Sequence, residues 1–275
     1  MNCPKCKSSI DKNFFCKKCN KNYLKNNKID FRLNEKKITD SFDKKKFFIK
    51  KYPRLYTLLV KLFSNVLIDN NLEKFIKKNI SKNMISVNFG SGNFKIRKDI
   101  INLDVIDYQN TDVLYDGDEL PFKDSSVDFL FNIAVLEHVS NPFEVINEFH
   151  RILSEDGILY CVIPFIFPYH ASPEDYTRFT KSGIKTLLKD FEIITLKPSG
   201  GPASGFLGIF QEFLAILFSF NSKKLYNYIY LPICLLTSPI KIMDKFFLNH
   251  PCAEKITSSF LVICKKRRKI EKNTL

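Results

Sequence analysis

The stretch Val87-Asn88-Phe89-Gly90-Ser91-Gly92-Asn93 joins an apolar run to a pair of closely spaced glycines. The apolar run is typical of a buried parallel strand, and the glycines let the backbone turn tightly and approach a ligand that a Cβ would block. Twelve residues after Gly92, Asp104 ends a second apolar run, Ile100-Ile101-Asn102-Leu103. An acid at the tip of the next strand can accept hydrogen bonds from ribose hydroxyls. The sequence therefore predicts a site for a nucleotide-containing cofactor.

Several more motifs follow Asp104 in a fixed order. They are Asp112-Val113-Leu114-Tyr115-Asp116, Leu120-Pro121-Phe122, Ser126 to Asn132, Val135-Leu136-Glu137-His138-Val139, Glu148 to Leu153, Gly157 and the strand from Ile158 to Pro164. This order and spacing resemble the class I S-adenosylmethionine-dependent methyltransferases over residues 83 to 200. A dinucleotide dehydrogenase would have a fuller GxGxxG motif and a longer helix before the acid, whereas Phe94 occupies the third glycine position here. We expect the first helix of the fold to be reduced to a turn.

The resemblance implies roles for the residues that match the family's motifs. The glycine loop would lie under the methionine part of S-adenosylmethionine, Asp104 would hold the ribose, and Asp116 would accept from the adenine amino group. The full set of implied cofactor-binding residues is Gly90, Ser91, Gly92, Asp104, Val105, Asp116, Gly117, Asn132 and His138. The family usually has an acid where Asn88 stands, so the contact with the cofactor departs from the pattern in detail.

Four of the eight cysteines form two pairs near the N-terminus, with the spacing CPKC, nine residues, CKKC. Such paired knuckles are typical of a tetrahedral zinc site, in which four thiolates bind one Zn²⁺ and fold a segment too short to have a core. Two disulfides are the alternative, but the polar N-terminus lacks the apolar stretch of a secretion signal. The predicted zinc ligands are Cys3, Cys6, Cys16 and Cys19. The segment Tyr23 to Phe31 resembles the strand that closes the zinc ribbons found before some methyltransferase domains.

The net charge of +14 is unevenly distributed along the chain. Lys and Arg number 22 against 7 acids in residues 1–82, 10 against 18 in residues 83–205, and 11 against 4 in residues 206–275. The predicted catalytic core is therefore acidic, and the basic charge lies on its flanks. An RNA enzyme usually needs positive potential that reaches the site, because phosphate contacts dominate affinity. An enzyme that faces a membrane needs basic charge only on the docking face.

The predicted fold is α/β, with a Rossmann-like methyltransferase sheet of seven strands, a small N-terminal zinc ribbon, and an apolar helical insertion between the last two strands. The ribbon covers residues 1–34, a basic linker and helical cap cover residues 35–82, and the methyltransferase domain covers residues 83–275. We expect strands at 84–89, 100–104, 111–115, 127–132, 157–163, 191–197 and 258–264, and helices at 47–78, 141–153 and 180–190. Asn141-Pro142 suits a helix start with Pro at the first helical position.

The insertion, residues 206–248, contains two apolar segments, Phe206 to Phe218 and Ile229 to Leu236. Neither reaches the roughly 20 apolar residues needed to span a bilayer. Short apolar helices joined by a turn rich in Tyr and Lys fit attachment to one side of an anionic membrane, with cations and aromatics at headgroup depth. The alternative is a soluble lid or a homodimer interface, in which protein would cover the apolar side chains.

A loop rich in polar and aromatic residues follows the fifth strand, from Pro164 to Thr180. Ligands of open α/β sheets bind beyond the carboxyl ends of the strands, so this loop should face the transferred methyl group. The candidate catalytic residues are His170, Asp175, Tyr176 and Arg178. The loop resembles the PxxH and DYxRFT stretch of methyltransferases encoded among bacterial surface-glycan genes. An ion pair between Asp175 and Arg178 that only stabilises the loop is the alternative.

These observations predict an enzyme that methylates an oxygen of a sugar or lipid-linked glycan precursor, with S-adenosylmethionine and zinc as cofactors, on the cytoplasmic face of the cell membrane. His170 is the expected general base, because its unperturbed pKa is near neutral. One alternative is an RNA base methyltransferase that recognises RNA through the zinc ribbon, although the acidic core makes nucleic acid an unfavourable partner. Another alternative is a domain that binds the cofactor or a partner protein without turnover.

Overall fold

The computed structural model describes residues 1–32, 58, 59, 64, 66, 71–117, 119–171 and 174–267. The predicted linker and most of the predicted helix over residues 47–78 lie outside the described residues. The N-terminal strands are β1 (Phe15–Cys16), β2 (Lys21–Asn22), β3 (Leu24–Lys25) and β4 (Lys28–Asp30). The strands of the main body are β5 (Ser86–Phe89), β6 (Ile101–Asp104), β7 (Val113–Leu114), β8 (Val127–Ile133), β9 (Leu153–Pro164), β10 (Phe191–Gly200) and β11 (Ser259–Lys266). The helices are α3 (Asn71–Asn79), α4 (Pro142–Ile152), α5 (Lys181–Leu187), α6 (Pro202–Phe218), α7 (Lys223–Thr237) and α8 (Asp244–Phe247), with short 3-10 turns η1 (Leu136–His138), η2 (Ser238–Met243) and η3 (Ala253–Lys255).

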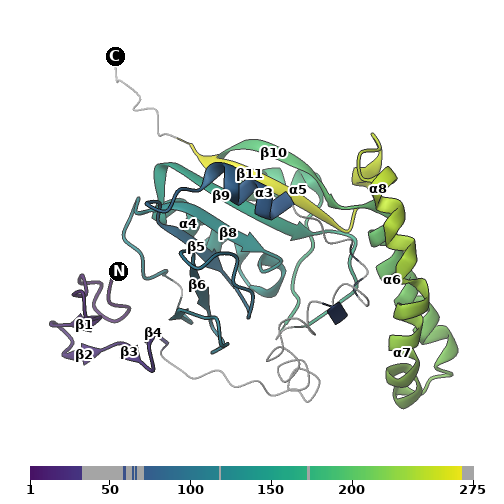
Figure 1. The fold of residues 1–275 in the computed structure, drawn as a ribbon, viewed down its shortest axis with the longest axis horizontal. Helices are drawn as coiled ribbons and strands as arrows, with labels where there is room; N and C mark the ends of the chain where they lie inside the picture. The colour runs from purple at the N-terminus through teal and green to yellow at the C-terminus, as the bar shows by residue number, and fades with distance from the viewer. Residues whose placement is uncertain are drawn as a thin grey trace.

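The main sheet has nine strands in the order β10-β11-β9-β8-β5-β6-β7-β4-β3, and Figure 1 shows its twist across the body of the molecule. The strands from β9 to β4 in this order pair in parallel with one another, whereas β11 is antiparallel to both β9 and β10, and β3 is antiparallel to β4. All seven strands expected in the methyltransferase domain are present. No helix occurs between β5 and β6, as expected from the short segment that joins them.

Helices cover both faces of this sheet. On one face, Ile146 and Phe149 of α4 and Ile184 of α5 enter the larger buried core. On the other face, α3 places Phe75 and Ile76 against aromatic residues of β8 and β9. The predicted start of α4 is confirmed, because Asn141 Oδ1 accepts from the backbone N–H of Glu144 at 3.4 Å and Pro142 follows it. Such two-sided coverage explains why the parallel strands read as continuous apolar runs.

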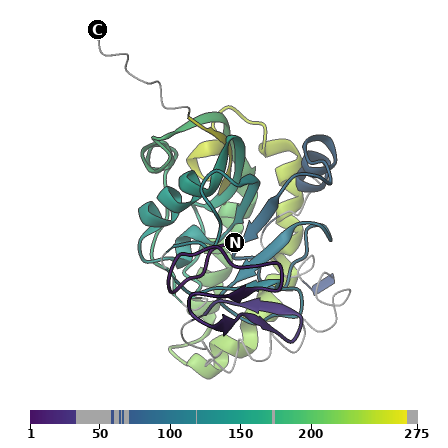
Figure 2. The ribbon, with the colours of Figure 1, turned by 90° about the vertical axis from the view of Figure 1, so that its left-hand side faces the viewer.

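The N-terminal unit contributes two strands, β3 and β4, to the main sheet. Strand β4 pairs in parallel with β7, with Ile29 opposite Val113 and Asp30 opposite Leu114. The backbone N–H of Phe31 also donates to Leu114 O at 2.8 Å. Figure 2, in which this unit faces the viewer, shows its strands at the edge of the sheet. A segment with few apolar residues is stabilised here by adding its strand to a larger sheet.

The insertion between β10 and β11 forms a helical hairpin of α6 and α7, followed by η2 and α8. Asp244 of α8 connects α8 to the start of α6, since its carboxylate accepts from the backbone N–H of Ala203 at 2.8 Å and of Ser204 at 2.9 Å. An acid at this position also suits the positive end of the α6 dipole. Figure 1 shows the hairpin at the opposite side of the molecule from the N-terminal strands. In the part of the chain that is described, no helix is both long and apolar enough to cross a membrane.

Candidate cofactor and acceptor site

The glycine loop between β5 and β6 has the geometry that requires glycine. Gly90 and Gly92 have φ values of +65° and +54°, which side-chain-bearing residues rarely adopt. A Cβ on Gly90 would lie 2.5 Å from the Cγ atoms of Val135, whereas a Cβ on Gly92 would meet no atom within 4 Å. Gly90 is therefore required by packing against Val135, and Gly92 by its backbone conformation.

Asp104 lies beside this loop at the end of β6. Its carboxylate accepts from the backbone N–H of Gly92 at 2.7 Å and from that of Ile106 at 2.9 Å. The residue is 8% exposed, so most of its surface is covered by the loop that it holds. Asp104 thus fixes the glycine loop. An ionised carboxylate offers about four acceptor positions, so these two hydrogen bonds are compatible with the predicted contact to a ribose hydroxyl.

A pocket of about 470 Å³ opens at the carboxyl end of the strands, next to the glycine loop and Asp104. Seven of the nine predicted cofactor residues line it: Gly90, Gly92, Asp104, Val105, Asp116, Gly117 and His138. The other two predicted residues, Ser91 and Asn132, are not among its lining residues. Ser91 Oγ lies 3.2 Å from Gly92 O, and Asn132 is fully buried in β8. The structure therefore brings most of the predicted cofactor residues together from four separate segments of the chain.

The departure at Asn88 is compensated inside the protein. Asn88 is buried in β5, and its amide nitrogen donates to Asn102 Oδ1 of the neighbouring strand at 3.2 Å. Asn102 in turn donates to the backbone oxygens of Phe94 and Asn110. A buried amide network thus joins β5 to β6 and to the backbone at Phe94 and Asn110.

The loop after β9 is braced by a buried ion pair. Both terminal nitrogens of Arg178 donate to the carboxylate of Asp175, and Nη2 also donates to Pro168 O at 3.1 Å. The backbone N–H of His170 donates to Asp175 Oδ2 at 2.8 Å. The Asp175 side chain is almost fully buried, and burial by itself raises the pKa of its carboxyl group. The hydrogen bonds from Arg178 and His170, together with the charge of Arg178, outweigh burial and lower this pKa. Asp175 and Arg178 therefore position the loop, whereas Tyr176 lines the pocket.

The exposed edge of this loop places His170 beside the η1 turn. The ring centroids of His138 and His170 are 4.9 Å apart in an edge-to-face arrangement. Burial and the neighbouring His138 lower the pKa of His170, which favours the neutral ring at pH 7. His170 Nδ1 lies 3.6 Å from Asp175 Oδ2 and 3.5 Å from Arg178 Nη2. Of the four predicted catalytic residues, only Tyr176 is a lining residue of the cofactor pocket.

Glu137 is a site residue that the sequence analysis did not single out. It is 1% exposed, it precedes His138 in η1, and burial raises the pKa of its carboxyl group to about 7. Within the described residues, neither carboxylate oxygen has a hydrogen-bond donor. The sequence offered one signal, an acid inside the apolar motif Val135-Leu136-Glu137-His138-Val139, but an acid there could equally have faced solvent.

The four N-terminal cysteines converge as predicted. Their sulfur atoms all lie within 4.8 Å of one another. The sulfur atoms of Cys3 and Cys19 are 3.7 Å apart, and those of Cys6 and Cys16 are 3.5 Å apart. Four thiolates at about 2.3 Å from one Zn²⁺ would be separated by about 3.8 Å. All four cysteines are free, so the residues fit a tetrahedral metal site better than two disulfides.

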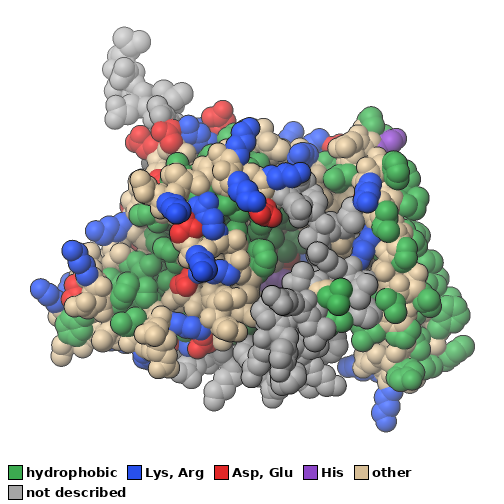
Figure 3. Space-filling model, viewed as in Figure 1, with side chains coloured by type: hydrophobic (Ala, Val, Ile, Leu, Met, Phe, Trp, Pro, Cys, Tyr) green, Lys and Arg blue, Asp and Glu red, His purple; other side chains and the backbone are tan. Residues whose placement is uncertain are grey.

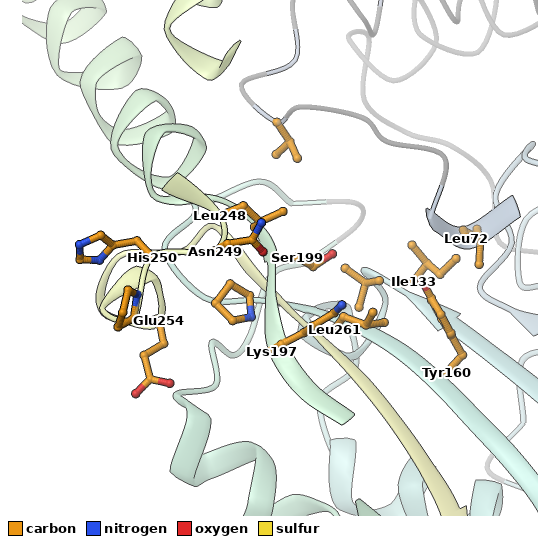
Figure 4. A pocket seen from close by; sticks show the side chains of 14 residues that line it. Leu72, Ile133, Tyr160, Lys197, Ser199, Leu248, Asn249, His250, Glu254 and Leu261 are labelled. Atoms are coloured by element: carbon orange, nitrogen blue, oxygen red, sulfur yellow. The ribbon is translucent and has the colours of Figure 1, made fainter. Parts of the chain in front are cut away.

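A larger cavity of about 620 Å³ lies elsewhere, between the sheet and the base of the helical hairpin. Figure 4 shows Ile133, Tyr160 and Leu261 of the sheet on one side of it and Leu248, Asn249 and His250 on the other. Neither the glycine loop nor Asp104 lines this cavity, so it is not the cofactor pocket.

The hairpin itself carries an apolar outer surface, which we call the hairpin face. Figure 3 shows hydrophobic side chains gathered along this edge of the molecule. Its members are large, exposed apolar residues: Phe206, Ile209, Phe213, Ile216, Leu217, Phe218, Phe220, Tyr228, Leu231, Leu235 and Leu236. The polar residues that interrupt α6 point the other way, because Gln211 donates to Thr237 Oγ1 at 3.0 Å and Glu212 accepts from Tyr226 at 2.5 Å.

Residues 63–161 match the family described as methyltransferase domain. Among solved structures, a chain from the complex between the Haloferax volcanii Trm112 methyltransferase activator and a methyltransferase is 13% identical, with a TM-score of 0.48 over 84% of this chain and 100% of that chain. An S-adenosylmethionine-dependent methyltransferase from Aquifex aeolicus is 17% identical, with a TM-score of 0.41 over 59% of this chain and 94% of that chain. A methyltransferase from Bacillus halodurans is 14% identical, with a TM-score of 0.45 over 73% of this chain and 100% of that chain. No curated protein matches the chain. The family match spans the glycine loop, Asp104 and His138.

Proposed function

We propose that this S-adenosylmethionine-dependent methyltransferase transfers its methyl group to an oxygen of a sugar or lipid-linked glycan precursor, at the cytoplasmic face of the cell membrane. The observation that carries the proposal is the hairpin face, an apolar surface from which the polar side chains of α6 are turned away. The resemblance of the loop from Pro164 to Thr180 to enzymes of bacterial surface-glycan gene clusters supports the acceptor class.

An anionic membrane is the proposed partner of the hairpin face. Covering one large apolar side chain contributes about 1.5 to 3 kcal/mol, so a surface with many of them favours an apolar environment strongly. The α6 helix has 17 residues and α7 has 15, which is shorter than the roughly 20 apolar residues that span a bilayer, so attachment to one side of a membrane is the arrangement that fits them. Lys223 and Lys224 at the tip of the hairpin add charge attraction to anionic headgroups. Lys241, in the η2 turn that follows α7, does not add to this charge, because it is buried and donates to Ser64 O at 2.6 Å.

The charge distribution supports a glycan acceptor over RNA. Residues 83–205 carry 10 basic against 18 acidic side chains, and they include the pocket and the loop from Pro164 to Thr180. A polyanion would be repelled from such a site, because phosphate contacts need Lys and Arg close to the reacting group. A sugar hydroxyl or a lipid-linked precursor held from the membrane side needs no positive channel.

Alignment of the two reactants would supply most of the catalysis. Bound S-adenosylmethionine supplies an electrophilic methyl group, and Gly90, Gly92 and Asp104 would fix its position in the pocket. The acceptor oxygen must approach within about 3 Å in line with the breaking bond, and holding it there can account for much of the rate. His170 is the proposed acceptor of the hydroxyl proton, since its neutral ring lies beside His138, which lines the pocket. Asp175 and Arg178 hold the loop that carries it.

Zinc is the proposed ligand of the four N-terminal cysteines. The sulfur separations of 3.5 Å and 3.7 Å support it, as does the position of these residues in a segment whose own core is small. The zinc would have a structural role, because four thiolates leave no open coordination position for a substrate.

The proposal is tested by following a labelled methyl group. Full-length protein would be incubated with methyl-labelled S-adenosylmethionine and, separately, with a membrane lipid extract or with total RNA from the same cells. We expect label in the lipid-linked glycan fraction, and much less of it with the variant Asp104→Asn at a cofactor concentration near the wild-type Kd, because this variant should bind the cofactor more weakly. Label that enters RNA and not the lipid fraction would overturn the proposed acceptor.

A further inference from the structure

The polar cluster beneath the acceptor side of the pocket has the composition of a metal site. Glu137, His138 and His170 each offer a ligand atom, and these atoms lie within 4.8 Å of one another. Glu137 and His138 come from the η1 turn, whereas His170 comes from the loop after β9. Two segments more than 30 residues apart in sequence thus place two imidazoles and one carboxylate around a common point.

The hydrogen bonding of His138 leaves its Nε2 atom available as a metal ligand. Nδ1 lies 2.6 Å from the backbone carbonyl oxygen of Glu174, and a carbonyl only accepts, so Nδ1 carries the proton. In the neutral ring, Nε2 then keeps its lone pair, and it lies 3.7 Å from Glu137 Oε1. Metal-binding histidines commonly donate their other N–H to a backbone carbonyl in this way. Two acceptors face each other across a gap that suits a bound cation.

Glu137 supplies the independent observation. Its carboxylate is buried, and neither oxygen has a hydrogen-bond donor among the described residues. Burying a charged group without a partner is costly. Burial raises the pKa of Glu137 and the charge of Arg178 opposes this rise, but both terminal nitrogens of the Arg178 guanidinium donate to Asp175, and it makes no hydrogen bond to Glu137 among the described residues. A cation between Glu137 and the two imidazoles would provide the missing partner.

We propose that Glu137, His138 and His170 bind one divalent cation of the first transition row. Two His and one carboxylate are a common ligand set for such ions, and three protein ligands leave coordination positions open. His138 also lines the cofactor pocket, so the open positions are within reach of an acceptor oxygen. The proposal deepens the proposed function and rests on it for the acceptor: with His170 as a ligand, a cation held there would lower the pKa of a bound acceptor hydroxyl, and the proton would pass to solvent water. Binding of the cation itself does not depend on the identity of the acceptor.

The test is a titration of full-length, zinc-loaded protein with Mn²⁺, followed by the electron paramagnetic resonance signal of the free ion. Mn²⁺ suits carboxylate and imidazole ligands and competes poorly with zinc for four thiolates. We expect one equivalent of Mn²⁺ to bind, and at least a 10-fold loss of affinity in Glu137→Gln and in His170→Asn. The control His250→Asn removes an exposed imidazole outside the cluster and should bind like the wild type.

The two cluster variants make the outcome decisive. Glu137 is buried and its variant could fail to fold, whereas the His170 side chain is 41% exposed, so His170→Asn then decides the question. Unchanged Mn²⁺ affinity in a folded His170→Asn protein, or no binding by the wild type at millimolar Mn²⁺, would overturn the proposal. Failure to methylate a glycan would contradict the proposed function and leave the Mn²⁺ titration unchanged.

Discussion

At the scale of single residues, the cofactor pocket depends on the absence of a Cβ at one position and on a carboxylate at another. Gly90 has no space for a Cβ beside Val135, and Asp104 bonds to the backbone of Gly92 and Ile106. Asp104 therefore has two functions, because it fixes the loop and presents oxygens to the pocket. Removing its charge should affect both.

We expect Asp104→Asn to weaken S-adenosylmethionine binding by about 10- to 150-fold, which corresponds to about 1.5 to 3 kcal/mol for hydrogen bonds to a charged group. Isothermal titration calorimetry measures the change. The matched control is Asp107→Asn, three residues further on, where the carboxylate pairs with Lys28 on the surface and does not line the pocket. Equal affinity of Asp104→Asn and the wild type would contradict the assignment.

Substitution of His170 should separate chemistry from cofactor binding. We expect His170→Ala to lower turnover by about 10²- to 10⁴-fold, while the affinity for S-adenosylmethionine stays nearly unchanged, because His170 acts only in the chemical step. Steady-state kinetics on the identified acceptor and calorimetry with the cofactor measure the two effects. A parallel loss of cofactor affinity would show that His170 supports the pocket structurally instead.

At the scale of elements, strand β7 connects the N-terminal unit to the pocket. Strand β4 pairs with β7, and the residues that follow β7, Tyr115, Asp116 and Gly117, line the pocket. The two-residue strand β7 therefore receives hydrogen bonds on one side from β6 and on the other from a segment that the cysteines fold. A loss of local order around Cys3 and Cys19 should therefore disturb the part of the pocket that Asp116 and Gly117 form.

Removal of zinc should thus weaken cofactor binding at a distance. We expect Cys3→Ser together with Cys16→Ser to lose the metal, to lower the melting temperature and to reduce the affinity for S-adenosylmethionine, because β4 no longer supports β7. Metal analysis, thermal unfolding and calorimetry measure the three effects. Cys252→Ser, at an exposed cysteine outside the cluster, is the control. Metal-free wild type with two disulfides would contradict the zinc assignment.

At the scale of the whole molecule, the cysteine unit and the helical hairpin lie on opposite sides of the sheet. The cysteine unit is at one edge of the sheet, the pocket is at the carboxyl ends of the central strands, and the hairpin stands at the opposite side (Figure 1). The hairpin face points outward, as Figure 3 shows. A membrane on that side would leave the cysteine unit away from the lipid.

The hairpin face should bind anionic vesicles. We expect the wild type to sediment with vesicles of phosphatidylglycerol and phosphatidylcholine, with partial release by salt, and Phe213→Ser with Ile216→Ser to lower binding at least 10-fold, given about 1.5 to 3 kcal/mol per buried side chain. The control is Ile194→Ser on β10, because Ile194 and Phe213 are each 57% exposed. If the wild type is dimeric in solution and does not sediment with vesicles, the hairpin face is a contact between two copies of the chain instead.

The sequence by itself predicted the positions of seven strands, the glycine loop, Asp104 and the cysteine cluster, but it did not predict that β3 and β4 extend the sheet to nine strands. Each depends on short spacings and on the period of apolar residues, which local backbone geometry converts directly into structure. Only the tertiary structure decided that Glu137 is buried beside two imidazoles, that Asp175 and Arg178 brace a loop, that β4 joins β7, and that Gln211 points into the hairpin. These features depend on which distant segments pack together, and burial of a polar side chain has no local sequence period that reveals it.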